Sequence, residues 1–259
     1  MPVNQGILRE DEFVYFLNHK KAKDLSPHLK FVLEVLFGIV DPSKTVFCKK
    51  TTGWIKPDII IKHLKVEKAV SIKTGISTSL QREDIKSFIL YLREQGISNR
   101  TQQTILLFHY GDGTNNGAGE KRFTSEEIKS MIPNRIKQAN EELNRNKEFV
   151  KRFVKRVMFE GNRKDTRAAD AIHYGNYKEG VVVTPLQIEK HIEKSDWDRY
   201  QTIHIGPILI SPSTRKEGID DKTTKKREEV QLYWPKLGSE LKYIAKKYGY
   251  YVSPYYQKK

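Results

Sequence analysis

The sequence contains only one cysteine, Cys48, among its 259 residues. A single cysteine excludes an internal disulfide and every zinc site that needs several cysteines. The seven histidines are scattered and show no His-Glu-x-x-His spacing, so the sequence does not support zinc-dependent hydrolysis. Because no internal disulfide can form, we expect the reducing environment of the cytoplasm.

Long hydrophobic segments are also absent from the sequence. No apolar run reaches the ~18 residues that a membrane-spanning helix needs, and residues 1–5 lack the basic and apolar parts of a signal peptide. No amphipathic segment has a clear apolar face that could insert into a membrane surface. We therefore expect no membrane partner.

Acidic residues are scarce relative to basic ones. The chain has 32 acidic and 47 basic side chains, which gives a formal net charge of +15. Such an excess favours a polyanionic partner such as nucleic acid, although a merely soluble basic protein would also have it. Charge alone does not choose between these alternatives.

Two short strands are predicted close together in the first half of the chain. Residues 56–61 and 69–75 are rich in Val and Ile and are bounded by proline, glycine and charged turns. Asp58 opens the first strand. Side chains alternate between the two faces of a strand, so Ser71 and Lys73 share one face of the second. The pattern predicts an acid and an ammonium group on neighbouring strands, an arrangement that can hold a divalent cation beside a phosphate.

At these residues the chain resembles the PD-(D/E)xK nuclease superfamily. Pro57-Asp58 matches the Pro-Asp of the family, and Ser71-Ile72-Lys73 matches its (D/E)xK with serine in place of the usual acid. Some restriction enzymes of the family carry Ser-x-Lys and take the missing carboxylate from the following helix. The resemblance implies an α/β fold with a mixed central sheet flanked by helices, a restriction-endonuclease-like core, and an α+β C-terminal extension. We expect the nuclease core over residues 1–124, and DNA binding and recognition over residues 125–259.

The same resemblance implies that Mg²⁺ assists phosphodiester hydrolysis. Mg²⁺ prefers hard oxygen ligands, usually one or two carboxylates together with water and phosphate oxygens. Asp58 is the expected central ligand, and Lys73 is expected to orient the attacking water and stabilise the phosphate in the transition state. Ser71 can supply only a weak oxygen ligand or hold a metal-bound water. The structural alternatives are a turn aspartate at Asp58 and a solvated strand lysine at Lys73.

A further carboxylate must then come from elsewhere in the chain. Glu34 lies within an apolar helical segment, residues 31–37, where an unpaired carboxylate would be costly. Glu83 and Asp84 are the nearest acids downstream of Lys73. Glu34 and Glu83 are the predicted additional metal ligands, and an exposed helical carboxylate is the alternative for each.

A basic segment with an apolar stripe lies between residues 145 and 167. One face of this segment can pack while the other contacts DNA phosphates, which would give salt-dependent affinity. The alternative is a solvated charged face. The predicted DNA-binding residues are Lys147, Lys151, Arg152, Lys155, Arg156, Arg163, Lys164 and Arg167.

Capping and turn signals predict the other elements. Ser26 as N-cap and Pro27 at the first helical position predict the start of a helix that ends near Gly38. Helices are further expected over residues 11–21, from a cap at 78 or 79, from 125, over 133–159, and from 184 and 236. Strands are expected over 45–48, 104–110, 180–183 and 204–210, and a flexible loop over 111–119.

These features together predict a Mg²⁺-dependent DNA endonuclease, most like a type II restriction enzyme that cuts double-stranded DNA at a short specific site. By family analogy, a homodimer would cut both strands of a palindromic site. Two alternatives remain. One is a structure-specific or repair nuclease of the same fold, and the other is a DNA-binding protein without catalysis, because Ser71 replaces the usual acid.

Overall fold

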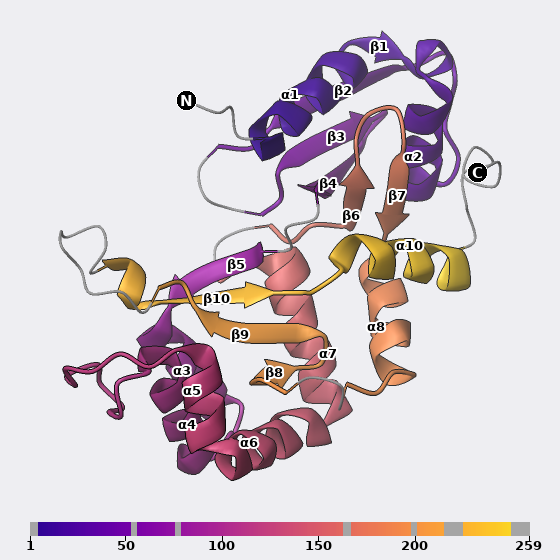
Figure 1. Ribbon diagram of the computed structural model, residues 1–259. Helices are drawn as coiled ribbons and strands as arrows, with labels where there is room; N and C mark the ends of the chain where they lie inside the picture. Colours follow the sequence, from indigo (N-terminus) through magenta and orange to yellow (C-terminus); the bar gives the residue numbers. More distant parts are fainter. Residues whose placement is uncertain are drawn as a thin grey trace. The chain divides into compact units, whose positions relative to one another are not determined.

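The computed structural model describes residues 5–52, 56–75, 79–162, 167–197, 201–214 and 225–249 (Figure 1). The chain forms two compact units, and each unit is assembled from separate stretches of sequence. The first unit comprises Met1–Thr78, Lys155–His191 and Lys236–Lys259, and the second comprises Ser79–Val154 and Ile192–Pro235. The units therefore do not divide at residue 124, because later segments return to complete the first unit. No helix in the described residues is long and apolar enough to cross a membrane.

The first unit contains a six-stranded mixed sheet with the strand order β1-β2-β3-β4-β6-β7. Among the described strands of this sheet, only β4 and β6 pair in parallel, and the other neighbours are antiparallel. This parallel pair explains why the first unit needs residues beyond 124. The strands are β1 (Lys20–Lys21), β2 (Thr45–Lys50), β3 (Ile59–His63), β4 (Val66–Lys73), β6 (Ala171–Gly175) and β7 (Gly180–Val183).

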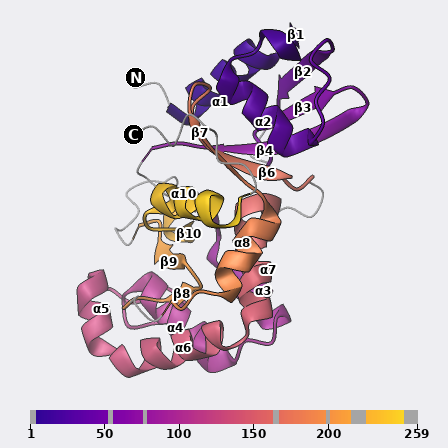
Figure 2. The same ribbon diagram turned by 90° about the vertical axis from the view of Figure 1, so that its right-hand side faces the viewer.

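Helices α1 (Gln5–Leu17) and α2 (Pro27–Phe37) cover one face of this sheet (Figure 2). Ser26 caps α2 as expected, since its hydroxyl accepts a hydrogen bond from the Leu29 amide at 3.3 Å. The alternating positions of β2, β3 and β4 bury their apolar side chains against the two helices. The core cluster includes Phe13, Leu17, Val32, Leu33, Val46, Cys48, Ile59, Ile61, Val70 and Ile72.

Two more helices belong wholly or mainly to the first unit. Helix α8 (Pro185–Glu193) follows β7, and α10 (Leu237–Tyr248) packs against β7. Both begin where the sequence predicts helices, at residues 184 and 236. A short 3₁₀ turn, Ala22–Asp24, connects β1 to the segment before α2. Helix α1 ends at Leu17 rather than residue 21, because Lys20 and Lys21 pair with β2 as strand β1.

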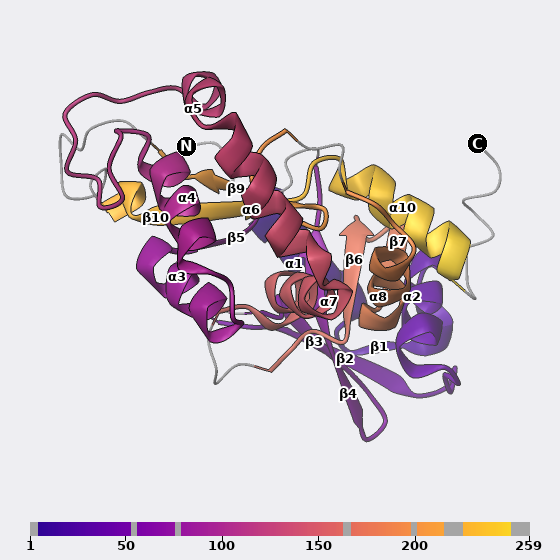
Figure 3. The same cartoon turned by 90° about the horizontal axis from the view of Figure 1, so that it is seen from below.

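The second unit contains a four-stranded antiparallel sheet with the order β5-β10-β9-β8. In this unit α4 packs against both α3 and α6 (Figure 3). The strands are β5 (Ser79–Asp84), β8 (His204–Ile205), β9 (Ile208–Pro212) and β10 (Glu229–Tyr233). The helices are α3 (Ile85–Glu94), α4 (Asn99–Tyr110), α5 (Ser125–Met131), α6 (Pro133–Arg145) and α7 (Lys147–Lys155). The last residue of α7, Lys155, is also the first residue of the second stretch of the first unit.

The region after residue 78 differs from the predicted helix cap. Residues 79–84 form strand β5, in which Glu83 is paired with Val230 of β10. The helix starts only at Ile85, where the Asp84 carboxylate accepts a hydrogen bond from the Ser87 amide at 2.8 Å. Pairing with a strand that is more than 140 positions away in sequence overrides the local capping-box pattern.

Residues 104–110 are helical and not the predicted strand. They form the second half of α4, which begins at the N-cap Ser98. The Glu142 carboxylate accepts hydrogen bonds from the Ser98 amide and hydroxyl, both at 2.7 Å, and so reinforces this helix start. A short apolar run is compatible with a buried strand or a buried helix, and tertiary packing selects the helix here.

Two predicted elements are each divided in the structure. The long helix over 133–159 breaks at Asn146, whose side chain accepts hydrogen bonds from the amides of Glu148 and Phe149 and so starts α7. The strand over 204–210 is split by a tight turn at Gly206, where φ is 56°. A Cβ at Gly206 would lie 2.6 Å from a methyl group of Val150, so both the turn and the packing require glycine.

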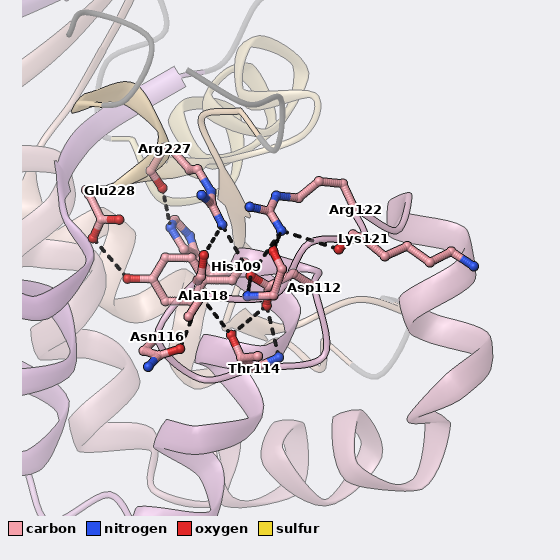
Figure 4. A network of polar contacts seen from close by, with 12 residues as sticks. His109, Asp112, Thr114, Asn116, Ala118, Lys121, Arg122, Arg227 and Glu228 are labelled. Atoms are coloured by element: carbon pink, nitrogen blue, oxygen red, sulfur yellow. Dashed lines mark hydrogen bonds and ion pairs between the residues drawn. The ribbon is translucent and has the colours of Figure 1, made fainter. Parts of the chain in front are cut away.

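The loop after α4 is highly hydrogen-bonded and is not the flexible linker that its glycines suggested (Figure 4). At its centre, the fully buried Asp112 carboxylate pairs with Arg122 and Arg227, each at 3.2 Å. It also accepts hydrogen bonds from the amide and hydroxyl of Thr114 and from the Gly119 amide. These hydrogen bonds and the Arg122 charge outweigh the effect of burial and hold the pKa of Asp112 below its usual value.

Candidate active site

Asp58, Ser71 and Lys73 lie together on one part of the first unit. The Ser71 hydroxyl donates a hydrogen bond to Asp58 Oδ2 at 2.9 Å, and Lys73 Nζ lies 3.7 Å from the same oxygen. Lys73 and Asp58 are each about one-fifth exposed, whereas Ser71 is fully buried. The predicted proximity of the acid and the lysine is therefore confirmed, although Asp58 lies directly before β3 and not on the strand.

The pairing of β3 with β4 explains this geometry. Ile59 lies opposite Val70, and both point into the core, so the adjacent Asp58 and Ser71 take the other face. The Asp58 amide donates to the Val70 carbonyl at 3.1 Å, which continues the ladder by one residue. The register places Lys73 two residues beyond Ser71 on the same face.

The Asp58 carboxylate is oriented by groups that all contact the same oxygen, Oδ2. Besides Ser71 and Lys73, the Ile72 amide donates to Oδ2 at 2.6 Å. The other oxygen, Oδ1, accepts no hydrogen bond from the described residues. Asp58 thus has one oxygen fixed by the protein and one oxygen available to a ligand.

Glu10 of α1 is a further member of this site that was not predicted from the sequence. Burial raises the pKa of Glu10, and the nearby Asp58 carboxylate raises it as well, whereas Lys50 and Lys73 lower it. Lys50 at the end of β2 forms an ion pair with Glu10 Oε2 at 3.1 Å. Glu10 was hidden in a charged run that reads as a solvated face. The available signal was helical spacing, because Glu10 shares a face with Phe13 and Leu17 at i+3 and i+7.

Lys56 brings a third amine to the surroundings of Asp58 and Lys73. Its Nζ donates a hydrogen bond to the carbonyl oxygen of Val157. Part of the residue is exposed, but burial of its amine lowers the Lys56 pKa well below the usual value, and the charge of Lys73 lowers it further. The candidate site therefore contains three amines, those of Lys50, Lys56 and Lys73, next to two carboxylates.

Glu34 and Glu83 are the two other predicted metal ligands. The Glu34 side chain is solvent-exposed on α2, so the apolar neighbours in sequence do not bury it. Its neighbours Leu33 and Leu36 point into the core while Glu34 occupies the exposed stripe of the helix. Glu83 is buried in β5 of the second unit, whereas Asp58 belongs to the first. A metal-binding role for Glu83 stays a prediction.

The predicted DNA-binding residues have varied surroundings. Several form intramolecular contacts: Lys147 donates to the Ser195 carbonyl at 2.5 Å, Lys151 pairs with Glu148 at 2.5 Å, and Lys155 lies 3.8 Å from Glu160. Arg167 contacts Glu67 and Asp170. Arg152 is exposed and Arg156 is half-buried, while Arg163 and Lys164 lie outside the described residues.

The oxygen donors of this site fit Mg²⁺. The described residues contain no cluster of three or more His, Cys, Asp or Glu side chains that could hold a metal. Mg²⁺, however, is usually held by one or two carboxylates and retains several waters. Asp58 Oδ1 and Glu10 Oε1 accept no hydrogen bonds from the part of the chain that is described. These two hard, anionic oxygens match the preference of Mg²⁺ over softer metals.

The comparisons with known proteins agree with this architecture. No model of a known protein family matches the sequence, and no curated protein sequence matches it either. Among solved structures, the chain is similar to the crystal structure of the restriction endonuclease MspI in complex with its cognate DNA, with a TM-score of 0.57. The sequence identity is 14%, and the match covers 88% of each chain. The predicted fold class is confirmed: this chain has a restriction-endonuclease-like α/β fold with a mixed sheet flanked by helices.

Proposed function

We propose that this protein is a Mg²⁺-dependent DNA endonuclease of the type II restriction class. The observation that carries the proposal is the meeting of Asp58, Ser71 and Lys73 around one carboxylate oxygen, with Glu10 beside them. A carboxylate pair and an adjacent lysine are the groups that phosphodiester hydrolysis needs. The net charge of +15 supports a polyanionic substrate.

Each residue has a defined role in this proposal. Asp58 and Glu10 would hold the metal ion, and bound Mg²⁺ stabilises negative charge on a phosphate and lowers the pKa of bound water. Ser71 and the Ile72 amide keep Asp58 in its rotamer through Oδ2. Lys73 orients the attacking water and stabilises the charge that develops on the phosphate. Ser71 therefore acts by positioning a carboxylate and does not replace one.

The substrate in this proposal is double-stranded DNA with a short specific site. The structurally similar MspI was crystallised with its cognate DNA, which supports duplex DNA as the substrate to test. The basic residues Arg152 and Arg156 are candidates for phosphate contacts. As a homodimer, the protein would cut both strands of a palindrome, and sedimentation with and without DNA measures that assembly.

Plasmid cleavage in the presence of Mg²⁺ tests the activity. We expect the Asp58→Asn and Lys73→Ala variants to lose ~10²-fold or more in single-turnover rate while they still bind DNA. Lys62→Ala is the matched control, because Lys62 is an exposed lysine of the adjacent strand that lies 4.0 Å from Glu67. Equal rates for all variants would contradict the assigned site.

The products distinguish the alternatives. Discrete fragments with reproducible ends support site-specific restriction. A preference for branched or flapped DNA supports a repair nuclease of the same fold. Tight DNA binding without cleavage under any divalent cation would overturn the enzymatic proposal and leave a DNA-binding protein.

A further inference from the structure

Lys56 connects the segment that leads into Asp58 with the end of a helix. Its amine donates a hydrogen bond to the carbonyl oxygen of Val157, which is fully buried. Val157 belongs to a π-helical turn, Arg156–Glu160, that continues α7. A long lysine side chain thus joins two segments about a hundred positions apart in sequence, both within the first unit.

The π-helical turn leaves carbonyl groups that need partners. The last carbonyls of a helix have no intrahelical donors, and those that are buried must find other ones. Gly161 donates to the Arg156 carbonyl at 2.8 Å, and Ala169 donates to the Phe159 carbonyl at 2.8 Å. Lys56 supplies the donor for Val157.

The chain around Asp58 is held firmly on its C-terminal side. The Asp58 amide donates a hydrogen bond to the Val70 carbonyl. The Asp58 carbonyl accepts one from the Thr51 amide at 3.0 Å. On the N-terminal side, Thr51 contacts the Pro57 carbonyl. Beyond Pro57, within the described residues, the Lys56 side chain is the contact that fixes the approaching segment.

The helical end that Lys56 reaches also carries basic groups. Lys155 and Arg156 lie at this end, and both were predicted to contact DNA phosphates. Lys56 therefore lies between the Asp58 segment and a helical turn that bears candidate phosphate contacts.

We infer that Lys56 is a positioning residue for cleavage, because its bond to Val157 fixes the Asp58 segment on the helical end that carries Lys155 and Arg156. This inference rests on the proposed nuclease function. Lys56 is not assigned a contact with the substrate or the metal. Its role is to keep Asp58 in register with DNA bound at that helical end, so its loss should lower the rate of cleavage and leave the binding of DNA unchanged.

Variants at Lys56 test the inference in the full-length protein. Lys56→Met removes the donor but keeps the apolar stem, and Lys56→Arg keeps an N–H donor at the end of a long side chain. We expect Lys56→Met to lower the single-turnover rate at saturating DNA by about tenfold or more, with DNA affinity within about twofold of wild type. Lys56→Arg should recover a substantial part of the rate. Lys62→Met on β3 serves as the matched control.

A merely structural role for Lys56 predicts a different result. In that case Lys56→Met would lower the melting temperature, but the folded variant would cleave at the wild-type rate, and this outcome overturns the inference. Equal loss in Lys56→Met and Lys56→Arg would also overturn it. If Lys56→Met does not fold, Lys56→Gln replaces it. The glutamine amide ends one bond short of the lysine amine, so the same loss of rate at unchanged DNA affinity is expected, and a wild-type rate would overturn the inference.

Amide hydrogen exchange tests the hydrogen bond between Lys56 and Val157 without any cleavage assay. The Gly161 amide reports on the helical end, and the Ile72 amide, which donates to Asp58 Oδ2, reports on the position of Asp58. We expect faster exchange at both amides in Lys56→Met. If the wild-type protein cleaves no DNA but both amides exchange faster in Lys56→Met, the proposed nuclease function is wrong, whereas the role of Lys56 in fixing the Asp58 segment is supported. If wild-type protein cleaves DNA but neither amide exchanges faster in Lys56→Met, the inference about Lys56 is wrong and the proposed function is unaffected.

Discussion

A buried pair of histidines makes the stability of the first unit dependent on pH. His28 of α2 and His173 of β6 contact each other through their Nε2 atoms at 2.9 Å. His28 is 4% exposed and His173 is fully buried, with Phe13 packed edge-on against His173. Burial lowers the pKa of His28 to about 4, although Glu179 opposes this shift, and burial followed by the charge of His28 lowers the pKa of His173 well below its usual value. Both rings are therefore neutral in the folded protein at neutral pH.

The sign and size of the effect follow from proton linkage. A histidine with a lowered pKa in the folded state contributes stability that is present above its unfolded pKa of ~6.5 and is lost as the pH falls toward the folded pKa. Between these values the unfolded chain binds one more proton, which costs about 1.4 kcal/mol per pH unit. Lowering the pH from about 7.5 to about 5 should therefore remove about 2 kcal/mol through His28 alone. His173 adds a loss of the same sign.

Urea unfolding followed by circular dichroism at these two pH values measures the loss. The matched variant is His28→Gln, which keeps a hydrogen-bonding group beside His173 but does not titrate. We expect its stability to fall by about 2 kcal/mol less than that of wild type over the same pH interval. An equal fall in the two proteins would refute the assignment of a neutral, buried His28.

Four further substitutions test other parts of the structure. Asp112→Ala removes a fully buried carboxylate from between two partly buried arginines (Figure 4) and should cost about 3 kcal/mol in urea unfolding. Glu142→Ala removes the support at the start of α4 and should cost about 1 kcal/mol in the same assay. Glu10→Gln should raise the Mg²⁺ concentration for half-maximal cleavage by ~10-fold or more, as measured by metal titration. Glu34→Gln, on the exposed face of α2, should leave that titration unchanged, and a shift equal to that of Glu10→Gln would contradict the assigned ligand pair.

The local sequence predicted the strands that carry Asp58, Ser71 and Lys73. Val- and Ile-rich runs with charged turns favour a hairpin, and strand alternation then places the polar side chains on one face. No distant part of the chain is needed for this inference. The α2 start at Ser26 and Pro27 was predicted for the same reason, since a cap is satisfied by amides only a few residues away.

Elements that depend on distant partners were predicted poorly. Strand β5 forms because residues 79–84 pair with β10, and β6 forms beside β4 although it lies about a hundred residues later. Residues 104–110 were assigned the wrong element because an apolar run of that length has no unique period. The sequence did not predict the order of the loop around Asp112, because Arg227, one of the two arginines that pair with Asp112, is far along the chain.

Of the two carboxylates of the candidate site, Asp58 was predictable from the local sequence and Glu10 was not. Asp58 could be identified because proline, strand and lysine follow in a short and specific order. Glu10 of α1 could not, because its charged neighbours hide its helical face and because its partner Lys50 lies on β2, about forty residues later. The apolar neighbours of Glu34 indicated a buried carboxylate, but they occupy the buried side of α2 while Glu34 faces solvent.

The sequence by itself determined the hairpin, the face shared by Ser71 and Lys73, and the positive charge that favours nucleic acid. Only the tertiary structure decided which helix brings a second carboxylate to Asp58, which strands complete the sheet, and what Lys56 contacts. The physical reason is range: capping and alternation act over a few residues, whereas ion pairs and strand pairing join groups whose distance in sequence says nothing about their distance in space.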